Sequence, residues 1–154
     1  MQEHGLKISE LVTLFNLEVL NRGSDYDTAL LTITDVNRPG LQFHSFYDYF
    51  DPRRLQALGK AEITYLKGLT TEQRRKCFDD LFLYDIPALV ISRGLDCFPE
   101  CLESARVHER TLLRTEETTV EFTSHTIEYL NRVLAPCVPR HGVLLDISGE
   151  GVMI

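Results

Sequence analysis

The stretch of sequence that decides the fold is Ala88-Leu89-Val90-Ile91-Ser92-Arg93-Gly94. It begins as an unbroken apolar run and ends in a polar turn with a glycine, which is typical of a strand buried on both faces of a parallel sheet. A second apolar, β-branched run, Ala29–Thr34, leads straight into the polar turn Asp35–Gly40. Buried strands that alternate with helices predict an α/β fold, with a largely parallel or mixed sheet flanked by helices.

Further helices and strands are expected on both sides of this strand. Before it, the apolar spacing predicts a helix over 7–16, strands over 17–20, 29–34 and 61–66, and helices that begin at Asp51-Pro52 and at Thr70. After it, the pattern predicts a helix over 99–107, a strand over 111–113 and a helix over 118–134.

Turn and capping residues predict where the helices begin and end. Asp51 as N-cap and Pro52 at the first helical position predict a helix that ends at Gly59. Thr70 followed by Gln73 matches a capping box and predicts the start of the next helix. The residues expected on one side of the helix over 118–134 are Val120, Ile127, Leu130 and Leu134.

The composition changes after Leu134. Ala135–Pro139 contains two prolines, as linkers do, and His141–Ile154 is typical of two strands joined by a turn at Ser148–Gly151. We therefore expect residues 1–135 to form one α/β domain, and residues 136–154 to be a linker followed by a C-terminal β-hairpin. The sequence stops within an apolar, strand-like run, which predicts a chain that continues.

The composition is that of a globular protein with an acidic surface. The 154 residues include 16 Lys+Arg and 23 Asp+Glu, for a formal net charge of −7, and 44% are apolar. A net negative charge disfavours binding to phosphate backbones, so no nucleic-acid partner is expected. No apolar run approaches the ~18 residues of a membrane span and Met1–Leu6 has no signal-peptide pattern, so we expect a cytoplasmic protein without a membrane partner.

The four cysteines match neither a metal site nor a disulfide framework. Cys97 and Cys101 are separated by one residue more than in a Cys-x-x-Cys motif, and Cys77 and Cys137 form no second pair at ligand spacing. Reduced thiols are expected and no metal site is predicted, with a metal or redox role as the alternative.

Two loops follow predicted strands, where open α/β sheets bind their ligands. The loop Asp35–Gly40 holds Arg38 and the loop Ser92–Gly94 holds Arg93, each near a glycine. Arginine offers a planar fork of donors that suits a carboxylate or a phosphate. The alternative is that both arginines are structural turn residues that cap carbonyls or pair with nearby acids.

Aromatic residues are concentrated between Phe43 and Phe50, where five occur within eight positions, together with a histidine and neighbouring acids. One interpretation is a catalytic or stacking surface. The other is core filling combined with a subunit contact, because buried aromatic side chains dominate both cores and interfaces.

The residues alone indicate no particular reaction. The sequence has no Gly-x-Ser-x-Gly, His-Glu-x-x-His or Gly-x-Gly-x-x-Gly motif, and Gly59-Lys60 lacks the other residues of a nucleotide-binding P-loop. His4, His108 and His125 have no spaced partner, so they are expected to be surface or capping residues.

A combination of segments is more specific than any single motif. Its members are Ile33–Gln42, Phe46–Phe50, Leu58–Glu62, Val90–Leu95, Tyr129–Pro136 and His141–Ile147. Together they cover nearly the whole chain and resemble the N-terminal domain of bacterial HPr kinase/phosphorylase, followed by the opening of its kinase domain.

This resemblance implies an enzyme that phosphorylates a serine of HPr, the phosphocarrier of the sugar phosphotransferase system, and removes the phosphate by phosphorolysis in carbon catabolite repression. It implies ATP and Mg²⁺ as cofactors of the full-length protein, HPr as its partner and a homo-oligomer, hexameric in the family. In the family a Gly-Asp-Ser-Gly-x-Gly-Lys-Ser loop directly follows the hairpin and cradles the nucleotide phosphates. Because this sequence stops just short of that loop, the fragment is expected to bind neither ATP nor Mg²⁺ and to be inactive.

The resemblance also implies site residues. His141 corresponds to the family's catalytic histidine, which orients or assists at the transferring phosphate. The family's N-terminal domain resembles the first domain of Mur ligases, which binds a uridine nucleotide-sugar through an Asp-Ser-Arg…Pro-Gly-like loop. The looser version here implies a small anionic-ligand or regulatory site, and its candidate residues are Thr34, Asp35, Arg38 and Gly40, with Arg93 from the second loop.

Two segments depart from the family pattern. Thr115–Phe122 is more acidic than usual, and Asp96–Cys101 carries cysteines that the family does not require. A second hypothesis is a stand-alone module for oligomerisation or ligand sensing. A Gly-rich loop with Lys-Ser in the reading frame beyond Ile154 would support the kinase, and a stop codon would support the module.

Overall fold

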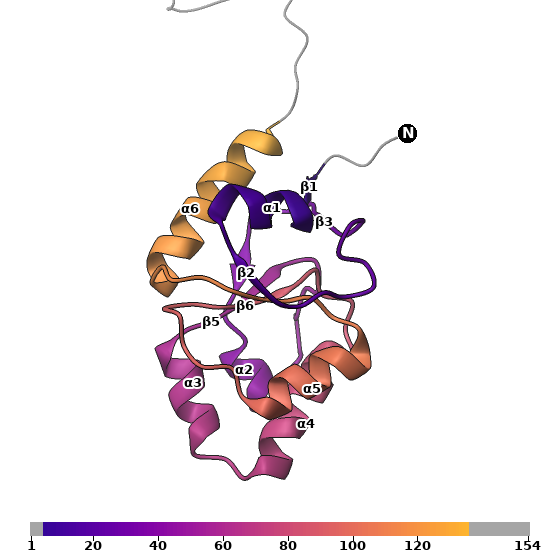
Figure 1. Cartoon of the computed structure of the whole chain (residues 1–154), viewed down its shortest axis with the longest axis vertical. Helices are drawn as coiled ribbons and strands as arrows, with labels where there is room; N and C mark the ends of the chain where they lie inside the picture. The colour runs from indigo at the N-terminus through magenta and orange to yellow at the C-terminus, as the bar shows by residue number, and fades with distance from the viewer. Residues whose placement is uncertain (1–4, 136–154) are drawn as a thin grey trace, which may run out of the picture.

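A five-stranded sheet lies at the centre of the computed structural model, which describes residues 5–135 (Figure 1). The strand order is β2-β7-β6-β5-β4, in which β4 to β7 run parallel and β2 pairs antiparallel with β7. The strands are β2 (Glu18–Asn21), β4 (Val36–Asn37), β5 (Leu55–Leu58), β6 (Leu89–Ile91) and β7 (Leu112–Arg114). The predicted α/β fold with a largely parallel or mixed sheet is confirmed.

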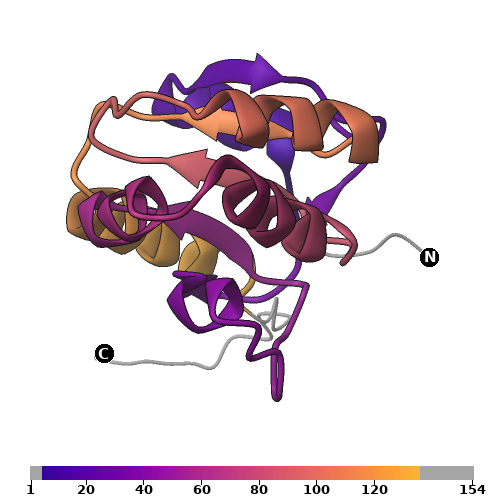
Figure 2. The same ribbon diagram turned by 90° about the horizontal axis from the view of Figure 1, so that it is seen from below.

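Helices cover both faces of this sheet. One face carries α1 (Ile8–Phe15) and α6 (Thr119–Val133), at the top of Figure 1. The opposite face carries α3 (Lys60–Lys67), α4 (Thr71–Phe82) and α5 (Pro99–His108), together with the short helix α2 (Gly40–Phe43). Figure 2 shows the same layers from below, with α3 and α4 toward the viewer.

The strand β6 explains why both faces are covered. Leu89 and Ile91 belong to the core under α3, α4 and α5, whereas Val90 belongs to the core under α1 and α6. Successive side chains of a strand point to opposite faces, so a continuous apolar run needs a helix layer on each side. All three side chains are buried, as the sequence predicts.

The predicted strand over 29–34 is wrong in length and in place. Only Leu30–Leu31 forms a strand, β3, which pairs antiparallel with β1 (Leu6–Lys7) in a separate two-stranded sheet. The predicted turn Asp35–Gly40 instead contains β4, which pairs with β5 at the edge of the main sheet. Because a two-residue edge strand needs no apolar run, its composition does not mark it.

The prediction is also wrong over 52–66, where helix and strand are exchanged. Leu55–Leu58 is the buried strand β5 instead of a helix, and the segment 61–66 lies in helix α3 instead of a strand. The Asp51 carboxylate accepts a hydrogen bond from the Arg53 backbone N–H at 3.0 Å and so closes a local turn instead of capping a helix. Burial of every residue of β5 outweighs these local helix signals.

The helix start predicted from the capping box at Thr70 is confirmed for α4, and the start predicted at about Thr118 is confirmed for α6. In both helices an N-cap threonine and the residue three positions on exchange hydrogen bonds. The predicted buried side of α6 is only partly right. Val120 is 73% exposed, while Phe122 and Leu130 are fully buried. The buried stripe of α6 consists of Thr119, Phe122, Thr126 and Leu130, and Val120 lies outside it.

No helix within residues 5–135 is long and apolar enough to cross a membrane. The predicted linker and hairpin over 136–154, the catalytic candidate His141 included, lie outside the described residues.

Candidate functional site

The carboxyl ends of four parallel strands meet at one edge of the sheet, which we name the carboxyl edge. The segments that leave it are Arg38–Gly40 after β4, Gly59 after β5, Ser92–Gly94 after β6 and Thr115–Thr118 after β7. Helices α3 and α6 begin here, so the positive ends of two helix dipoles face this edge. These features make the carboxyl edge suited to an anion.

Arg38 lies at the carboxyl edge and is held by Glu62 of α3. Its Nε and Nη2 donate to Glu62 Oε1 at 3.2 and 2.8 Å, and the Gly59 backbone N–H donates to the same oxygen at 2.7 Å. The Glu62 side chain is 10% exposed, against 42% for Arg38. The Glu62 carboxylate therefore occupies the N-terminus of α3 and takes the donors that an anionic ligand would use there.

Gly59 lies where two side chains crowd the backbone. A Cβ at this position would collide with Nη2 of Arg38 and with Oγ1 of Thr119. Its φ of −115° is open to any residue, so the constraint comes from space and not from the backbone. Gly59 thus lets the start of α3 approach both Arg38 and the start of α6.

Two buried hydroxyls tie the strand ends to α6. Ser92 Oγ donates to the Leu58 carbonyl at 2.8 Å and lies 2.5 Å from Thr119 Oγ1. Because the Ser92 proton goes to the carbonyl, Thr119 is the donor of the second bond. Both residues are buried, so this part of the edge is closed by its own hydrogen bonds.

Arg93 also lies at the carboxyl edge, but unlike Arg38 it is held by its backbone and not by its side chain. Its φ of 60° is in the left-handed region, and its backbone N–H donates to the Glu117 carbonyl at 2.7 Å. The side chain is exposed, and within residues 5–135 its guanidinium has no hydrogen bond or ion pair. A fixed backbone and an unpaired cation make Arg93 the candidate most open to a ligand.

The structure places the residues Thr34–Gly40 at the two ends of β4. Arg38 and Gly40 lie at the carboxyl edge, whereas Thr34 and Asp35 precede β4 at the opposite edge. There Asp35 forms an ion pair of 3.5 Å with Arg54, and its carboxylate accepts from its neighbour's N–H. The predicted residues therefore do not share one site, and an anion-binding role stays a prediction.

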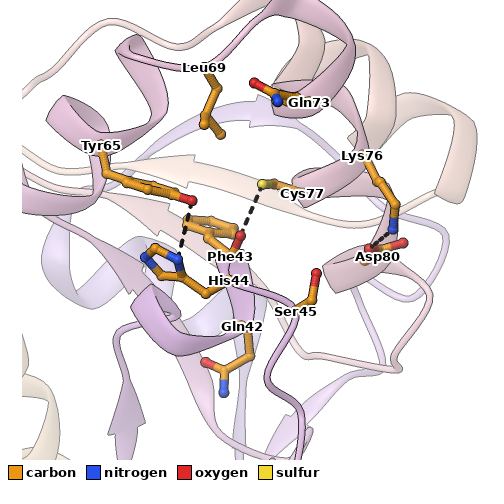
Figure 3. Close-up of a pocket in the computed structure, with 10 residues that line it drawn as sticks. All are labelled: Gln42, Phe43, His44, Ser45, Tyr65, Leu69, Gln73, Lys76, Cys77 and Asp80. Carbon is orange, nitrogen blue, oxygen red and sulfur yellow. Dashed lines mark hydrogen bonds and ion pairs between the residues drawn. The ribbon is translucent and has the colours of Figure 1, made fainter.

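A hollow of about 330 Å³ lies beside α2, between α3 and α4 (Figure 3). Three pairs of its lining groups interact with each other: Tyr65 Oη and His44 Nδ1 at 3.4 Å, Cys77 Sγ and the Phe43 carbonyl at 3.4 Å, and Lys76 Nζ and Asp80 Oδ2 at 2.7 Å. The other lining residues are Gln42, Ser45, Leu69 and Gln73. The hollow offers donors and acceptors to a small polar molecule.

The thiol in this hollow is not an activated nucleophile. Burial, with the Asp80 carboxylate adding to it, raises the pKa of Cys77. The thiol therefore stays protonated at neutral pH, and its hydrogen goes to the Phe43 carbonyl. Because Asp80 also neutralises Lys76, the hollow has no strong charge with which to hold an ion.

The aromatic segment divides between core and surface. Phe43 is buried and meets Phe78 edge-on with ring centroids 5.6 Å apart, and Tyr47 stacks on Tyr84 at 4.8 Å. Tyr49, by contrast, is 97% exposed. Core filling is confirmed for Phe43, and the subunit contact stays a prediction.

Four residues that organise the carboxyl edge are not among the predicted site residues, although Ser92 begins one of the two predicted ligand loops. They are Gly59, Glu62, Ser92 and Thr119. The available signal is Glu62, because a carboxylate three residues after an N-cap commonly accepts the N-cap N–H. Ser92 and Thr119 lie far apart in sequence, and no local pattern pairs them. Within residues 5–135, no group of three His, Cys, Asp or Glu side chains is placed to hold a metal ion.

The fold and the carboxyl edge define the class: an α/β domain with helices on both faces of a mixed sheet. One solved structure that shares this fold contains the CBS and DRTGG domains of the regulatory region of Clostridium perfringens pyrophosphatase, in complex with its activator diadenosine tetraphosphate. The TM-score is 0.53 at 15% sequence identity, over 80% of this chain and 49% of that one. At this identity the similarity shows a common fold alone.

The sequence comparison identifies the family. The family described as HPr Serine kinase N terminus matches residues 6–130. The HPr kinase/phosphorylase of Alkaliphilus metalliredigens is 42% identical over 149 residues and that of Clostridium tetani 41% over 150, with 97% of this chain and 48% of each relative covered. The chain belongs to the HPr kinase/phosphorylase family, as the resemblance predicts, and spans about half the length of these relatives.

Proposed function

We propose that this chain is the N-terminal, regulatory or assembly part of a bifunctional, ATP-dependent HPr serine kinase/phosphorylase that controls carbon catabolite repression in the cytoplasm. The observation that carries the proposal is the family match over residues 6–130, combined with 48% coverage of full-length relatives. The described α/β domain thus corresponds to one half of such an enzyme.

The residues support a division of labour between the two halves. These 154 residues contain no Gly-x-x-x-x-Gly-Lys motif to cradle nucleotide phosphates. At the carboxyl edge, Glu62 already takes the donors that a phosphate would need. We therefore assign ATP, Mg²⁺, HPr binding and most hexamer contacts to the other half of the full-length protein, with His141 at its start assisting at the transferring phosphate.

A chimera tests this function. Residues 1–135 replace the matching part of the Alkaliphilus metalliredigens enzyme, and the chimera is compared with the intact enzyme and with a version that lacks its N-terminal half. The 154 residues alone are expected to phosphorylate no HPr, and the chimera is expected to regain the assembly or regulation that the shortened enzyme loses. HPr phosphorylation by the 154 residues alone contradicts the proposal, as does a chimera identical to the shortened enzyme in assembly, activity and effector response.

A stand-alone ligand-binding or oligomerisation module with a Mur-ligase-like anion site is the second candidate. The observation that favours it is the exposed guanidinium of Arg93, unpaired within residues 5–135, at the edge where α3 and α6 begin. Titration calorimetry with UDP-sugars and phosphorylated sugars tests it. Heat that is lost in Arg93→Gln but kept in Arg106→Gln, an exposed arginine of α5, supports the site, and no heat with any ligand rules it out.

A further inference from the structure

Two cysteines stand at the start of α5. Cys97 directly precedes the N-cap residue Phe98, and Cys101 lies in the first helical turn, where its backbone N–H donates to the Phe98 carbonyl at 3.0 Å. The two side chains belong to the same apolar cluster, since Cys97 packs against the core that contains Cys101. The pair is thus arranged much like dithiols at helix N-termini, although its spacing is one residue longer.

The two thiols differ in access. Cys101 is fully buried in the core under α3, α4 and α5, whereas Cys97 is half-buried and packs against that core from outside. A dissolved reagent therefore reaches Cys97 first, and Cys101 only from within the protein.

The surroundings of Cys97 favour its thiolate. A hydrogen bond from the Cys101 thiol lowers the pKa of Cys97, against the opposing effect of burial. The guanidinium of Arg114 and the backbone N–H of Leu102 act in the same direction as this hydrogen bond. Burial and the interaction with Cys97 raise the pKa of Cys101 well above its usual range. The pair therefore combines an accessible nucleophile with a protonated neighbour.

We propose that Cys97 is a thiol-modification site that reacts with low-molecular-weight disulfides, and that Cys101 is the resolving thiol that completes an intramolecular disulfide. The substrate class is a dissolved disulfide RSSR, of which oxidised glutathione is the probe. The proposal goes beyond the kinase function and does not depend on it. In a reducing compartment such a disulfide is transient and serves redox sensing.

The reaction consists of two thiol–disulfide exchanges. In the first, the Cys97 thiolate forms a bond to one sulfur of RSSR, the S–S bond of the reagent breaks, and RS⁻ leaves. In the second, Cys101 loses its proton to solvent and attacks the Cys97 sulfur, so that the protein disulfide forms and a second RS⁻ leaves. Two electrons pass from the protein dithiol to RSSR, and the protons of both protein thiols end on two molecules of RSH.

Arg114 connects this chemistry to the rest of the domain. Its guanidinium joins β7 to β2 through Glu18 at 2.9 Å, and joins β7 to the loop before α5 through the Leu95 carbonyl at 3.2 Å. A disulfide ties Cys97, two residues after Leu95, to Cys101 of α5. Oxidation therefore acts on the loop that leaves β6 at the carboxyl edge.

Cys77 provides a matched control within the same chain. It is also half-buried, and each thiol donates to a backbone carbonyl at 3.4 Å, Cys77 to that of Phe43 and Cys97 to that of Phe98. The two differ in their surroundings, because burial and the Asp80 carboxylate raise the pKa of Cys77. Because the thiolate is the nucleophile in disulfide exchange, Cys77 is expected to react more slowly than Cys97, by roughly tenfold or more.

Peptide mapping tests the proposal on the intact 154-residue chain. The chain is incubated in graded mixtures of oxidised and reduced glutathione, quenched with acid, digested with trypsin and analysed by mass spectrometry. Both cysteines lie in the tryptic peptide Gly94–Arg106, and Cys77 lies in Cys77–Arg93. The expected result is loss of both thiol hydrogens from Gly94–Arg106 while Cys77 is still free, with reversal by reduced glutathione.

Three variants separate the roles of the thiols. Cys101→Ala is expected to stop at a glutathione adduct on Cys97, and Cys97→Ala to leave the buried Cys101 unmodified. Cys77→Ala is expected to leave the oxidation of Gly94–Arg106 unchanged. If Cys101→Ala does not fold, the alkylation rate of the unaltered chain against pH is measured, and Cys97 should reach half its maximal rate at a lower pH than Cys77.

Several results would overturn the proposal. One is that Cys97 and Cys101 remain unmodified thiols in a glutathione mixture that already modifies Cys77. Another is oxidation of Cys101 at an unchanged rate in the Cys97→Ala chain, and a third is a disulfide between the Cys97 residues of two chains. Equal pH midpoints for alkylation of Cys97 and Cys77 would also contradict it.

Discussion

Arg38 follows β4 and Arg93 follows β6, so the two guanidinium groups start from the same edge of the sheet with β5 between them. Arg38 gives two donors to Glu62, at 3.2 and 2.8 Å, and is fixed at the start of α3. Arg93 is fixed only by its backbone, and within residues 5–135 its side chain has no polar partner. We call Arg38–Gly40 the closed loop, because Glu62 already pairs with its arginine. We call Ser92–Gly94 the open loop, because its arginine is exposed.

The difference follows from what comes after each strand. Gly59 leads directly from β5 into α3, which carries Glu62 in its first turn, so a carboxylate is at hand for Arg38. After β6 the chain instead runs through the segment 95–98, which is neither helix nor strand, before α5 begins. An arginine beside a sheet edge thus indicates a ligand site only where no nearby helix supplies its own carboxylate.

The largest expected effect comes from filling the closed loop. Gly59→Ala places a methyl group against Arg38 and the buried Thr119, and overpacking of this kind typically costs about 1–3 kcal/mol of unfolding free energy. Urea denaturation of the 154-residue chain measures the loss. Gly40→Ala is the control, because no atom lies within 4 Å of its added Cβ, and it should leave the midpoint nearly unchanged. Equal effects of the two variants would show that the closed loop is not crowded.

The next largest loss of unfolding free energy is expected at the buried hydroxyl pair of Ser92 and Thr119. Ser92→Ala removes the donor to the Leu58 carbonyl and leaves Thr119 without its buried partner, at a cost of about 1–2 kcal/mol. Thr119→Val in the same background tests the coupling, since the double variant should lose less than the sum of the single variants. Ser124→Ala, at an exposed position of α6, is the control and should cost almost nothing. Additive losses would mean that the two hydroxyls act independently.

Ser92 and Thr119 also show which parts of the structure can be predicted from the sequence. The strand β6 and the helices α4 and α6 are predicted because their signals are local. The signal is an apolar run for β6, a threonine with an acceptor side chain three residues later for α4, and the spacing of apolar residues for α6. The pairing of Ser92 with Thr119 is not predicted, because it depends on the order of strands in the sheet, which brings together residues 27 positions apart.

The error over 52–66 has the same physical cause. Asp51-Pro52 and Gly59 are strong local signals, yet they occur in a turn and at a helix start. What makes Leu55–Leu58 a strand is its position between β4 and β6, where all four side chains are buried. Burial in the sheet is a property of the whole fold, so the sequence of this segment alone cannot reveal it.

A smaller effect is expected when the internal carboxylate of the closed loop is neutralised. Glu62→Gln keeps an oxygen for the Gly59 N–H but removes the charge that pairs with Arg38, which is 42% exposed. Solvent screening limits the cost in unfolding free energy to about 0.5–1 kcal/mol. The same variant should strengthen binding of inorganic phosphate in titration calorimetry, because Arg38 is then free. Glu103→Gln, at an exposed position of α5, is the control and should change neither the unfolding free energy nor phosphate binding. Unchanged phosphate binding in Glu62→Gln would show that Arg38 does not bind an anion even without its carboxylate partner.

The smallest effect, of opposite sign, is expected in the open loop. Arg93 has φ 60°, and this left-handed conformation costs a residue with a side chain about 1–2 kcal/mol. Glycine avoids that cost, but it loses more conformational entropy on folding, which cancels part of the gain. Arg93→Gly should therefore raise the unfolding free energy by about 0.5 kcal/mol, provided that the Arg93 side chain makes no stabilising contact. Arg106→Gly is the matched control, because glycine inside α5 should destabilise the chain by about 1 kcal/mol. A loss of stability in both variants would mean that the Arg93 side chain is held by contacts of its own, and the contrast between the two loops would fail.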